Sequence, residues 1–338
     1  MLIANPVFVE NTDYAYAVAR VRALETKLIN PASLGSLLAT PRDKLAGALA
    51  DTARIKAPGS GNLEAILSGL EESYTQTLYT VKSLLLEDAM KRLVSLRYDY
   101  EIMKFIVKEE RGHAALLPGE LSRRSNYSYP LLKTLLEGGK AFDTGETMSS
   151  AYLSLKRMRE ATGKTIDDAC DRANYTETFA ILEGYGNDFL KGYFVRQVDA
   201  QNILTTLRLK IKKEKRAAVR EMYLPFGSID VTYLEAGFEM NLDGFATKLV
   251  FSPFSAVMKG AVKGPDEQAQ VIALERALEE ELLKYLKESM FITFGVEPVL
   301  TYLWVRENEV KNLRTILLSK AAGLAPEDIK KHLRGFNG

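Results

Sequence analysis

The segments "YFVRQVDAQNILTTLRLK" (193–210) and "YLWVRENEVKNLRTILLSK" (302–320) are two versions of one sequence. Both keep apolar residues at spacings of three and four, which predicts a helix. Placing Arg196 on Arg306 aligns them without a gap at an offset of 110 residues. The pairs matched in this way are Val195 with Val305, Asp199 with Glu309, Asn202 with Asn312, Leu207 with Leu317 and Lys210 with Lys320. The chain therefore contains an internal repeat.

A fainter third version lies upstream in "LRYDYEIMKFIVK" (96–108). Asp99 stands 100 residues before Asp199, but Ile102 takes the place of the asparagine. Short segments that begin at prolines accompany each long one. We therefore predict three helical repeat units, at 1–115, 116–220 and 221–322, with a terminal half unit at 323–338 that closes against the N-terminal helix.

The repeated acid and asparagine are three residues apart, so both project from one face of the helix. We interpret them as frame residues that cap or cross-link backbone at a partly buried face, and as interface contacts second. Catalysis is not expected, because chemistry requires one asymmetric constellation. The residues given this structural or interface role are Asp99, Arg196, Asp199, Asn202, Arg306, Glu309 and Asn312.

The sequence predicts an all-α chain. Prolines mark helix starts at "NPASL" (30–34), "TPRD" (40–43) and "GPDEQ" (264–268). Long helices are expected over about 71–110 and 175–215, and a third tract, 266–320, should break at Gly295 and Pro298. One stretch, "LPFGSIDVTYL" (224–234), could hide a strand.

Composition narrows the function further. The 338 residues include 45 Lys and Arg against 44 Asp and Glu, so no net field favours nucleic acid or anionic lipid. The single cysteine, Cys170, excludes an internal disulfide framework and indicates a reducing compartment. The N-terminus does not resemble a signal peptide, and no apolar run approaches the roughly 20 residues that span a bilayer. We expect a cytoplasmic protein.

Two motifs between Arg159 and Asp171 imitate ligand sites. Gly163, Lys164 and Thr165 resemble the end of a phosphate-binding loop, but Met158 stands where that loop needs its first glycine. We therefore expect no nucleotide there, and instead a helix that ends at Gly163 and a next helix capped by Thr165.

The second motif is the spacing D-D-x-x-D of Asp167, Asp168 and Asp171, which could hold Mg²⁺ for a pyrophosphate, as all-α isoprenoid synthases do. The facing segment, 183–194, lacks the second acidic motif that such an enzyme needs. A Mg²⁺-dependent isoprenoid-type synthase is the alternative function.

Other chemistry has little support in the sequence. His113 and His332 have no neighbouring ligands at metal spacing and no nucleophile partner, so both are expected to be solvated. The basic run 210–220 ends a long helix, where cations favour the helix dipole; it could also meet an acidic partner or lipid headgroups. No cofactor or metal is expected.

Taken together, the repeated R-x-x-[DE]-x-x-N helix, the opening "YAYAVARVRALETKLI" (14–29) and the closing segment 297–334 resemble the C subunit of prokaryotic V/A-type rotary ATPases, the counterpart of the d subunit of vacuolar ATPases. The resemblance covers nearly the whole chain. It departs at Ile102, which puts exact symmetry of the units in question.

The resemblance implies a funnel of three similar helical domains around a pseudo-threefold axis. In that family the funnel is a non-catalytic socket that joins the central stalk (D and F subunits) to the membrane rotor ring, so that rotation passes between them. It implies no catalytic residues, no nucleotide and no nucleic acid, and a position on the cytoplasmic face of the membrane with only indirect membrane contact. An unrelated helical repeat scaffold would share the frame but not the funnel.

Overall fold

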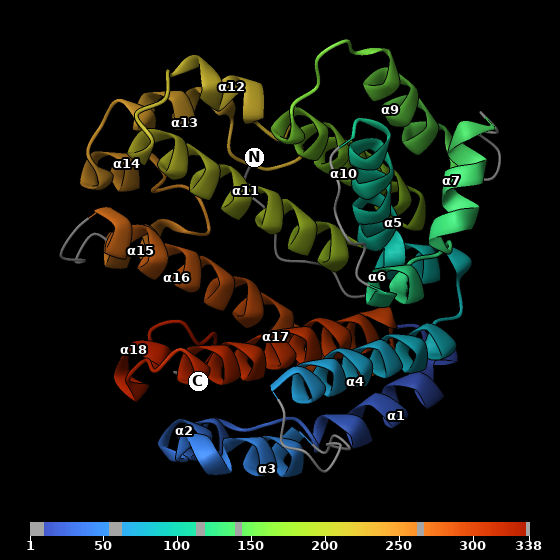
Figure 1. The fold of residues 1–338 in the computed structure, drawn as a ribbon, viewed down its shortest axis with the longest axis vertical. Helices are drawn as coiled ribbons and strands as arrows, with labels where there is room; N and C mark the ends of the chain where they lie inside the picture. The colour runs from blue at the N-terminus through green and yellow to red at the C-terminus, as the bar shows by residue number, and fades with distance from the viewer. Residues whose placement is uncertain (1–9, 54–62, 113–118, 139–143, 262–266, 336–338) are drawn as a thin grey trace. The chain divides into compact units, whose positions relative to one another are not determined.

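The computed structural model describes residues 10–53, 63–112, 119–138, 144–261 and 267–335 (Figure 1). The regular secondary structure of these residues is helical, with no strand among them, which confirms the all-α fold class. The stretch that could have hidden a strand forms turns and then the start of a helix, Val231–Phe238 (α13).

The helices follow one another along the chain with short connections. In order they are η1 (Thr12–Tyr14), α1 (Ala15–Glu25), α2 (Pro31–Ala39), α3 (Arg42–Ala53), α4 (Leu63–Leu84), α5 (Asp88–Glu110), α6 (Gly119–Arg124), α7 (Tyr129–Glu137), α9 (Glu146–Arg157), α10 (Gly163–Tyr185), α11 (Asp188–Ile211), α12 (Ala217–Met222), α13 (Val231–Phe238), α14 (Leu242–Lys248), α15 (Ser255–Ala261), α16 (Glu267–Lys287), η2 (Glu288–Phe291), α17 (Val296–Ala321) and α18 (Pro326–Lys330).

Each long tract of the sequence is two helices and not one. The predicted break at Gly295 is confirmed, since α17 begins at Val296 with Pro298 in its first turn. The continuous helices expected over 71–110 and 175–215 are wrong, because α4 ends at Leu84 and α10 ends at Tyr185. Gly186 ends α10 and so causes the second break. Its φ of 73° lies in the left-handed region, and its N–H donates to the Leu182 carbonyl. Neither break contains a proline, and the spacing of apolar residues continues across both, so the sequence pattern did not indicate that a helix ends there.

The helix caps are partly as expected. Asn30 caps α2 by accepting a hydrogen bond from the Ser33 N–H at 2.8 Å. The predicted end of a helix at Gly163 is wrong: α9 ends at Arg157, Gly163 is the first residue of α10, and Thr162 is its cap in place of Thr165. Of the start predicted at "GPDEQ", Pro265 and Asp266 lie outside the described residues.

The chain divides into two compact units, 78–187 (unit 2) and 1–77 with 188–338 (unit 1). In unit 2, α5 lies along α10 and is covered by α6, α7 and α9. The core of unit 2 comprises side chains of α5, α7, α9 and α10, including Tyr100, Ile102, Leu132, Tyr152 and Cys170.

Unit 1 contains two such arrangements. In one, α11 lies along α16 and carries α12 and α13, with α14 and α15 completing a core that includes Ile203, Phe245 and Phe254. In the other, α17 packs against α1, α2, α3 and α18, and α18 also contacts α2. This second arrangement draws its helices from both ends of the sequence (Figure 1).

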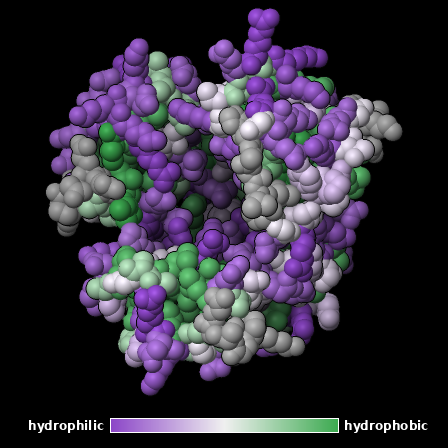
Figure 2. Space-filling model, viewed as in Figure 1, coloured by the Kyte–Doolittle hydropathy of each residue, from purple (hydrophilic) through white to green (hydrophobic). Residues whose placement is uncertain are grey.

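The face of the molecule seen in Figure 2 is mainly hydrophilic. Hydrophobic residues are visible over the region of α17 and α18, where Leu318 and Leu324 are each 40% exposed (Figure 2). None of the helices among the described residues combines the length and the hydrophobicity that crossing a membrane requires.

Candidate functional site

The repeated asparagine of α11 binds the backbone of one distant residue. Asn202 is 2% exposed; its Nδ2 donates to the Leu224 carbonyl at 2.9 Å, and its Oδ1 accepts from the Leu224 N–H at 2.9 Å. A side-chain amide carries both an acceptor oxygen and a donor nitrogen, so it can pair with an N–H and a C=O of the same residue. Asn202 thereby fixes the chain after α12 onto α11.

Asp199, one turn earlier on the same face, holds the start of the next helix. Its carboxylate is fully buried and accepts from Ser228 Oγ at 2.6 Å and from the Ile229 N–H at 3.0 Å. Burial raises the pKa of Asp199, and the hydrogen bonds from Ser228 and Ile229 oppose that rise. Ile229 directly precedes Asp230, the cap of α13.

The same contacts recur on α17. Asn312 donates to the Arg334 carbonyl at 2.8 Å and accepts from the Arg334 N–H at 2.9 Å, again 22 residues along the chain. Glu309 accepts from the N–H of Ile29, which directly precedes Asn30, the cap of α2. The C-terminal copy of the repeat is thus completed by the N-terminal helices.

The repeated lysine also binds backbone. Lys210 Nζ donates to the Phe238 carbonyl at 2.6 Å and to that of Met240, at the end of α13. Lys320 donates to the Thr40 carbonyl at the end of α2. A cation at these carbonyls satisfies groups that a helix terminus leaves free and favours the helix dipole. In these two copies the acid therefore holds the start of one short helix, α13 or α2, and the lysine holds its end.

The repeated arginines behave differently from each other. Arg306 binds Glu309 of its own helix and donates to Ser73 Oγ of α4 at 3.0 Å. Arg196 instead lies over the ring of Tyr285, 4.0 Å from its centroid, and donates to the Gly192 carbonyl at 3.1 Å. We call the repeated acid, asparagine and lysine of a copy, with the backbone groups that they bind, the anchor of that copy. Arg306 belongs to the anchor on α17 through its contact with Glu309, and Arg196 does not belong to the anchor on α11.

The first copy of the repeat replaces its missing asparagine from the loop. Asp99 is fully buried and accepts from Ser125 Oγ, from the Asn126 N–H at 2.7 Å and from Asn126 Nδ2 at 2.7 Å. Asn126 Nδ2 also donates to the Arg92 carbonyl at 3.1 Å. Ile102, at the position of the repeated amide, is buried in the core of unit 2.

Burial raises the pKa of Asp99 to about 6, and the hydrogen bonds from Ser125 and Asn126 limit the rise. The charge of Arg92 also opposes the rise, and Lys82 Nζ donates to Ser95 Oγ at 3.0 Å and to Asn126 Oδ1 at 3.2 Å. Burial also lowers the pKa of Lys82. The anchor of unit 2 is thus a buried carboxylate with an indirect cation partner.

Sequence reasoning identified the acids and amides but not their loop partners Ser125, Asn126, Ser228 and Ile29. A signal for two of the loops was present: "LINPASL" (28–34) and "SIDVTYL" (228–234) share the isoleucine, the capping Asn or Asp and the leucine at the same spacing. That match becomes meaningful only when α17 and α2 are seen to pack together.

Two of the three aspartates of the D-D-x-x-D motif, Asp167 and Asp171, are ion-paired with lysines of α5. Asp167 lies 2.6 Å from Lys108 Nζ, and Asp171 lies 2.6 Å from Lys104 Nζ. No group of three or more His, Cys, Asp or Glu side chains in the described part of the chain could hold a metal ion. The structure gives the isoprenoid-type alternative no support.

The remaining candidate groups of the sequence are two histidines and one cysteine. His332 is exposed, and His113 lies outside the described residues. Burial raises the pKa of the Cys170 thiol to about 12.

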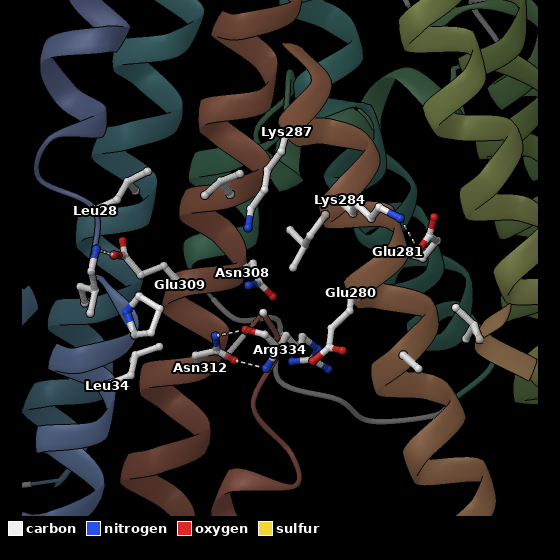
Figure 3. Close-up of a pocket in the computed structure, with 17 residues that line it drawn as sticks. Leu28, Leu34, Glu280, Glu281, Lys284, Lys287, Asn308, Glu309, Asn312 and Arg334 are labelled. Atoms are coloured by element: carbon white, nitrogen blue, oxygen red, sulfur yellow. Dashed lines mark hydrogen bonds and ion pairs between the residues drawn. The ribbon is translucent and has the colours of Figure 1, made fainter. Parts of the chain in front are cut away.

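A cavity of about 540 Å³ opens beside the anchor on α17 (Figure 3). Leu28, Ile29 and Leu34 form its apolar side, and Lys287 and Asn308 point into it. Glu309, Asn312 and Arg334, all members of the anchor, form part of its wall. A cavity with this lining could accept a short segment of chain and carries no arrangement for catalysis.

Comparison with known proteins settles the family. The family described as "ATP synthase (C/AC39) subunit" matches residues 17–332. The chain belongs to this family. Its members are non-catalytic subunits of rotary ATPases, so this chain is a structural subunit of such a complex and has no active site of its own.

Two archaeal relatives cover the chain almost end to end, and a bacterial one covers about three quarters of it. The chain is 24% identical to the C subunit of the A-type ATP synthase of Thermococcus kodakarensis, over 95% of this chain and 90% of the relative. It is 26% identical to the C subunit of the A-type ATP synthase of Methanosarcina mazei, over 96% and 93%. It is 22% identical to the C subunit of the V-type sodium ATPase of Enterococcus hirae, over 72% and 74%.

Proposed function

We propose that this protein is a coupling and spacer element, a socket that joins the central stalk of a V/A-type rotary ATPase to its membrane rotor ring. Rotation would then pass through it during ion transport and ATP synthesis or hydrolysis. The observation that carries the proposal is the family match over residues 17–332. The names of the relatives, which are subunits of an A-type ATP synthase and of a V-type sodium ATPase, support it.

The proposed frame has three similar units, at 1–115, 116–220 and 221–322, around a pseudo-threefold axis, with 323–338 as a half unit. It is supported by the anchors on α11 and α17, which use equivalent residues, and by the anchor at Asp99 in unit 2. A part that transmits torque must resist bending, and buried polar contacts that lack alternatives restrain the backbone. In this proposal Arg196, Asp199, Asn202, Arg306, Glu309 and Asn312 act on the frame, and any contact they make with the stalk is secondary.

The proposed partners are the central-stalk subunits of the D and F type and the subunits of the rotor ring. We place the protein on the cytoplasmic face of the membrane, with membrane contact only through the ring, and assign it no nucleotide or nucleic acid.

One exposed turn of the described surface suits a protein partner. Phe291 is 87% exposed and the adjacent Met290 is 63% exposed, at the turn between α16 and α17. Arg22 holds this turn by donating to the carbonyls of Ser289 and Met290, each at 3.3 Å. A rigid turn that presents large apolar side chains is typical of a protein–protein contact surface.

The test is association of the purified chain with the purified D and F stalk subunits, measured by pull-down and by calorimetry, with the ATP hydrolysis of the chain assayed alone. We expect binding at micromolar concentration or tighter and no hydrolysis. Absence of association at that concentration would count against the proposal.

Two variants distinguish a residue that contacts the partner from a residue that stabilises the fold. Phe291→Ser should leave the urea midpoint unchanged and weaken binding to the stalk or to the ring, whichever meets this turn. Asn202→Ala should do the reverse: it lowers the midpoint and leaves the affinity of the folded protein unchanged. An affinity loss in Asn202→Ala that exceeds the fraction unfolded would show that the anchor itself meets the partner.

A further inference from the structure

The turn that follows α11 contains a lysine in a left-handed backbone conformation. Lys213 has a φ of 55°, and in the part of the chain that the structure describes it is the one residue other than glycine with a positive φ. A side chain is strained in that conformation. Such strain is kept where a contact or a function requires the side chain, so Lys213 needs an explanation.

The other two copies of the repeat end their long helix with a left-handed glycine. Gly112 follows α5 with a φ of 77°, and Gly323 follows α17 with a φ of 82°. The turns after α11 and α17 also share a hydrogen bond. The N–H of Lys213 donates to the Lys210 carbonyl at 2.9 Å, and the N–H of Gly323 donates to the Lys320 carbonyl at 3.0 Å. Glycine is therefore sufficient for this turn, and the fold does not explain the lysine.

Lys213 belongs to a cationic segment that the third copy lacks. Its neighbours Lys212 and Lys215 are exposed, as Lys213 is, and none of the three forms an ion pair with another described residue. The offset of 110 residues places Ala322, Gly323 and Ala325 at these three positions of the third copy. We call Lys212, Lys213 and Lys215 the basic turn. It is an exposed cationic surface that only the copy on α11 has of these two.

Exposed aromatic rings lie on helices that pack near the same end of α11. The ring centroids of Tyr233 on α13 and Phe251 after α14 lie 4.8 Å apart, yet the two residues remain 43% and 47% exposed. Val250, next to Phe251, is 58% exposed. We call these three residues the aromatic patch. Contiguous exposed apolar side chains of this kind mark a contact surface.

The aromatic patch is also missing from the third copy. The match between 28–34 and 228–234 continues at the same offset of 200 residues, since buried Leu45 and Leu49 correspond to buried Phe245 and Leu249. In this register the positions of the patch hold Ser33, Ala50 and Asp51. The two copies therefore share their helices and differ in the side chains that face solvent.

Ion pairs join the segment after the basic turn to the helix that carries Tyr233. Arg220 of α12 pairs with Glu235 of α13 at 2.8 Å, and Arg216 lies 3.8 Å from the same carboxylate. Both arginine side chains remain more than half exposed. Figure 1 shows α12, α13 and α14 gathered around the C-terminal end of α11. The basic turn and the aromatic patch are thus parts of one group of packed helices.

We propose that this surface binds an acidic segment of a partner protein, with carboxylates on the basic turn and apolar side chains on the aromatic patch. Unpaired cations select an anionic partner by charge complementarity. The rings pack on each other and do not protrude, which suits a protein segment lying across them, whereas anchoring in lipid requires side chains that insert. The proposed coupling role does not use this surface, and the inference stands whether or not that role holds.

Fluorescence anisotropy of the full chain with a labelled amphipathic peptide of Glu and Leu tests the proposal. The same peptide with Lys in place of Glu is the control. We expect the acidic peptide to bind at least about tenfold more tightly, and to weaken by about tenfold as salt rises from about 0.05 to 0.3 M. Equal affinity for the two peptides would overturn the proposal.

The third copy supplies variants of the surface. Lys212→Ala/Lys213→Gly/Lys215→Ala should weaken the acidic peptide by about tenfold and reduce its salt dependence. Tyr233→Ser/Phe251→Ser should weaken it by a similar factor and keep the salt dependence. The matched control, Lys27→Ala/Lys44→Ala/Lys287→Ala, removes three exposed lysines elsewhere in unit 1 and should leave the affinity unchanged. Unchanged affinity in either surface variant, or an equal loss in the control, would overturn the proposal.

Lys213→Gly alone gives a readout that a role in folding would not produce. It should raise the midpoint of thermal unfolding by about 1–2 °C, because the strain is relieved, and should weaken the acidic peptide by about threefold. A lowered midpoint would show that Lys213 serves the fold and would overturn the proposal. Sedimentation with phosphatidylglycerol vesicles covers the other source of negative charge. A chain that binds these vesicles through the basic turn but does not bind the peptide would assign the surface to lipid, which also overturns the proposal.

Discussion

At the residue scale, the acid and the asparagine of the repeat each make one kind of contact with the backbone. Asn202 and Asn312 each pair with both backbone groups of a single residue, and Asp199 and Glu309 accept from the N–H just before a helix cap. A buried backbone N–H or C=O without such a partner costs free energy of folding. The repeated side chains therefore fix the position of the loops whose backbone groups they satisfy. Replacing them should affect folding before any interface.

Asn202→Ala should lower the free energy of unfolding by about 1–3 kcal/mol, because it leaves the buried N–H and C=O of Leu224 unpaired. Urea denaturation followed by circular dichroism measures this. Gln201→Ala, one position earlier and exposed, is the control and should change the free energy by less than about 0.5 kcal/mol. Equal midpoints for the two variants would contradict the anchor.

Asp99 should make stability depend on pH. Its pKa of about 6 in the folded protein lies above the ordinary 3.8, so the folded state binds the proton more tightly. The stability that Asp99 contributes is full below pH 3.8 and is lost as the pH rises through 6. Relative to the wild type, Asp99→Asn should therefore gain about 3 kcal/mol of unfolding free energy between pH 3.8 and pH 7.

The slope of the difference between variant and wild type is the readout, since the new amide also changes the hydrogen bonds with Asn126 at every pH. Asp199→Asn should remove a slope of the same sign, because burial raises that pKa too. Parallel pH profiles for wild type and Asp99→Asn would show that Asp99 does not titrate in this range.

At the element scale, paired long helices repeat with variation. Lys104 and Asp171 join α5 to α10 at 2.6 Å, and Arg314 and Glu71 join α17 to α4 at 3.0 Å. The corresponding pair on α11 and α16 is apolar, with Leu204 in the core and Val271 packed against it. One helix pairing thus accepts either an ion pair or a hydrophobic contact, provided both partners change together.

A double-mutant cycle tests this exchange. Lys104→Leu alone should destabilise unit 2 because it leaves Asp171 and Glu101 without their cation. Adding Asp171→Val should recover most of the loss, with a coupling of about 1 kcal/mol, because the pair then copies Leu204 and Val271. Additive losses would indicate that the helices do not tolerate the exchange.

The glycines before α11 should respond in opposite directions. Gly186→Ala should destabilise by about 1 kcal/mol, since φ at Gly186 is 73° and a side chain is strained there. Gly184→Ala should stabilise by up to about 1 kcal/mol, because Gly184 is exposed inside α10 and has nothing within 4 Å of a new Cβ. Thermal unfolding of both variants gives the signs, and a shift in the same direction would refute the assigned break.

At the scale of the whole molecule, the chain folds into two compact units, and unit 1 is assembled from both ends of the sequence. α17 receives α1, α2 and α3 from the N-terminal end and α18 from its own end. The helices α1, α2, α3 and α18 therefore contribute to the packing of unit 1 around α17.

Deleting residues 324–338 should loosen unit 1 and spare unit 2. The deletion removes α18, its contacts with α2 and the Arg334 backbone that Asn312 binds. Native-state hydrogen exchange should show lost protection in α2 and α17, with α5 and α10 unchanged. Uniform loss across both units would mean that they unfold as one.

The sequence by itself determined the helical class and the repeat with its recurring acids and asparagines, because the spacing of apolar residues and the recurrence of polar residues can be read locally. It missed the breaks at Leu84 and Tyr185, where no proline interrupts the pattern, and it offered Asp167, Asp168 and Asp171 as a metal site because spacing alone does not reveal facing lysines. Only the tertiary structure decided that Lys104 pairs with Asp171 and Lys108 with Asp167, and that Asn126 replaces the amide missing at Ile102. It alone joined Glu309 to Ile29, because a contact between residues 280 apart depends on how the helices pack, and the pattern shared by 28–34 and 228–234 does not by itself say which helix each segment meets.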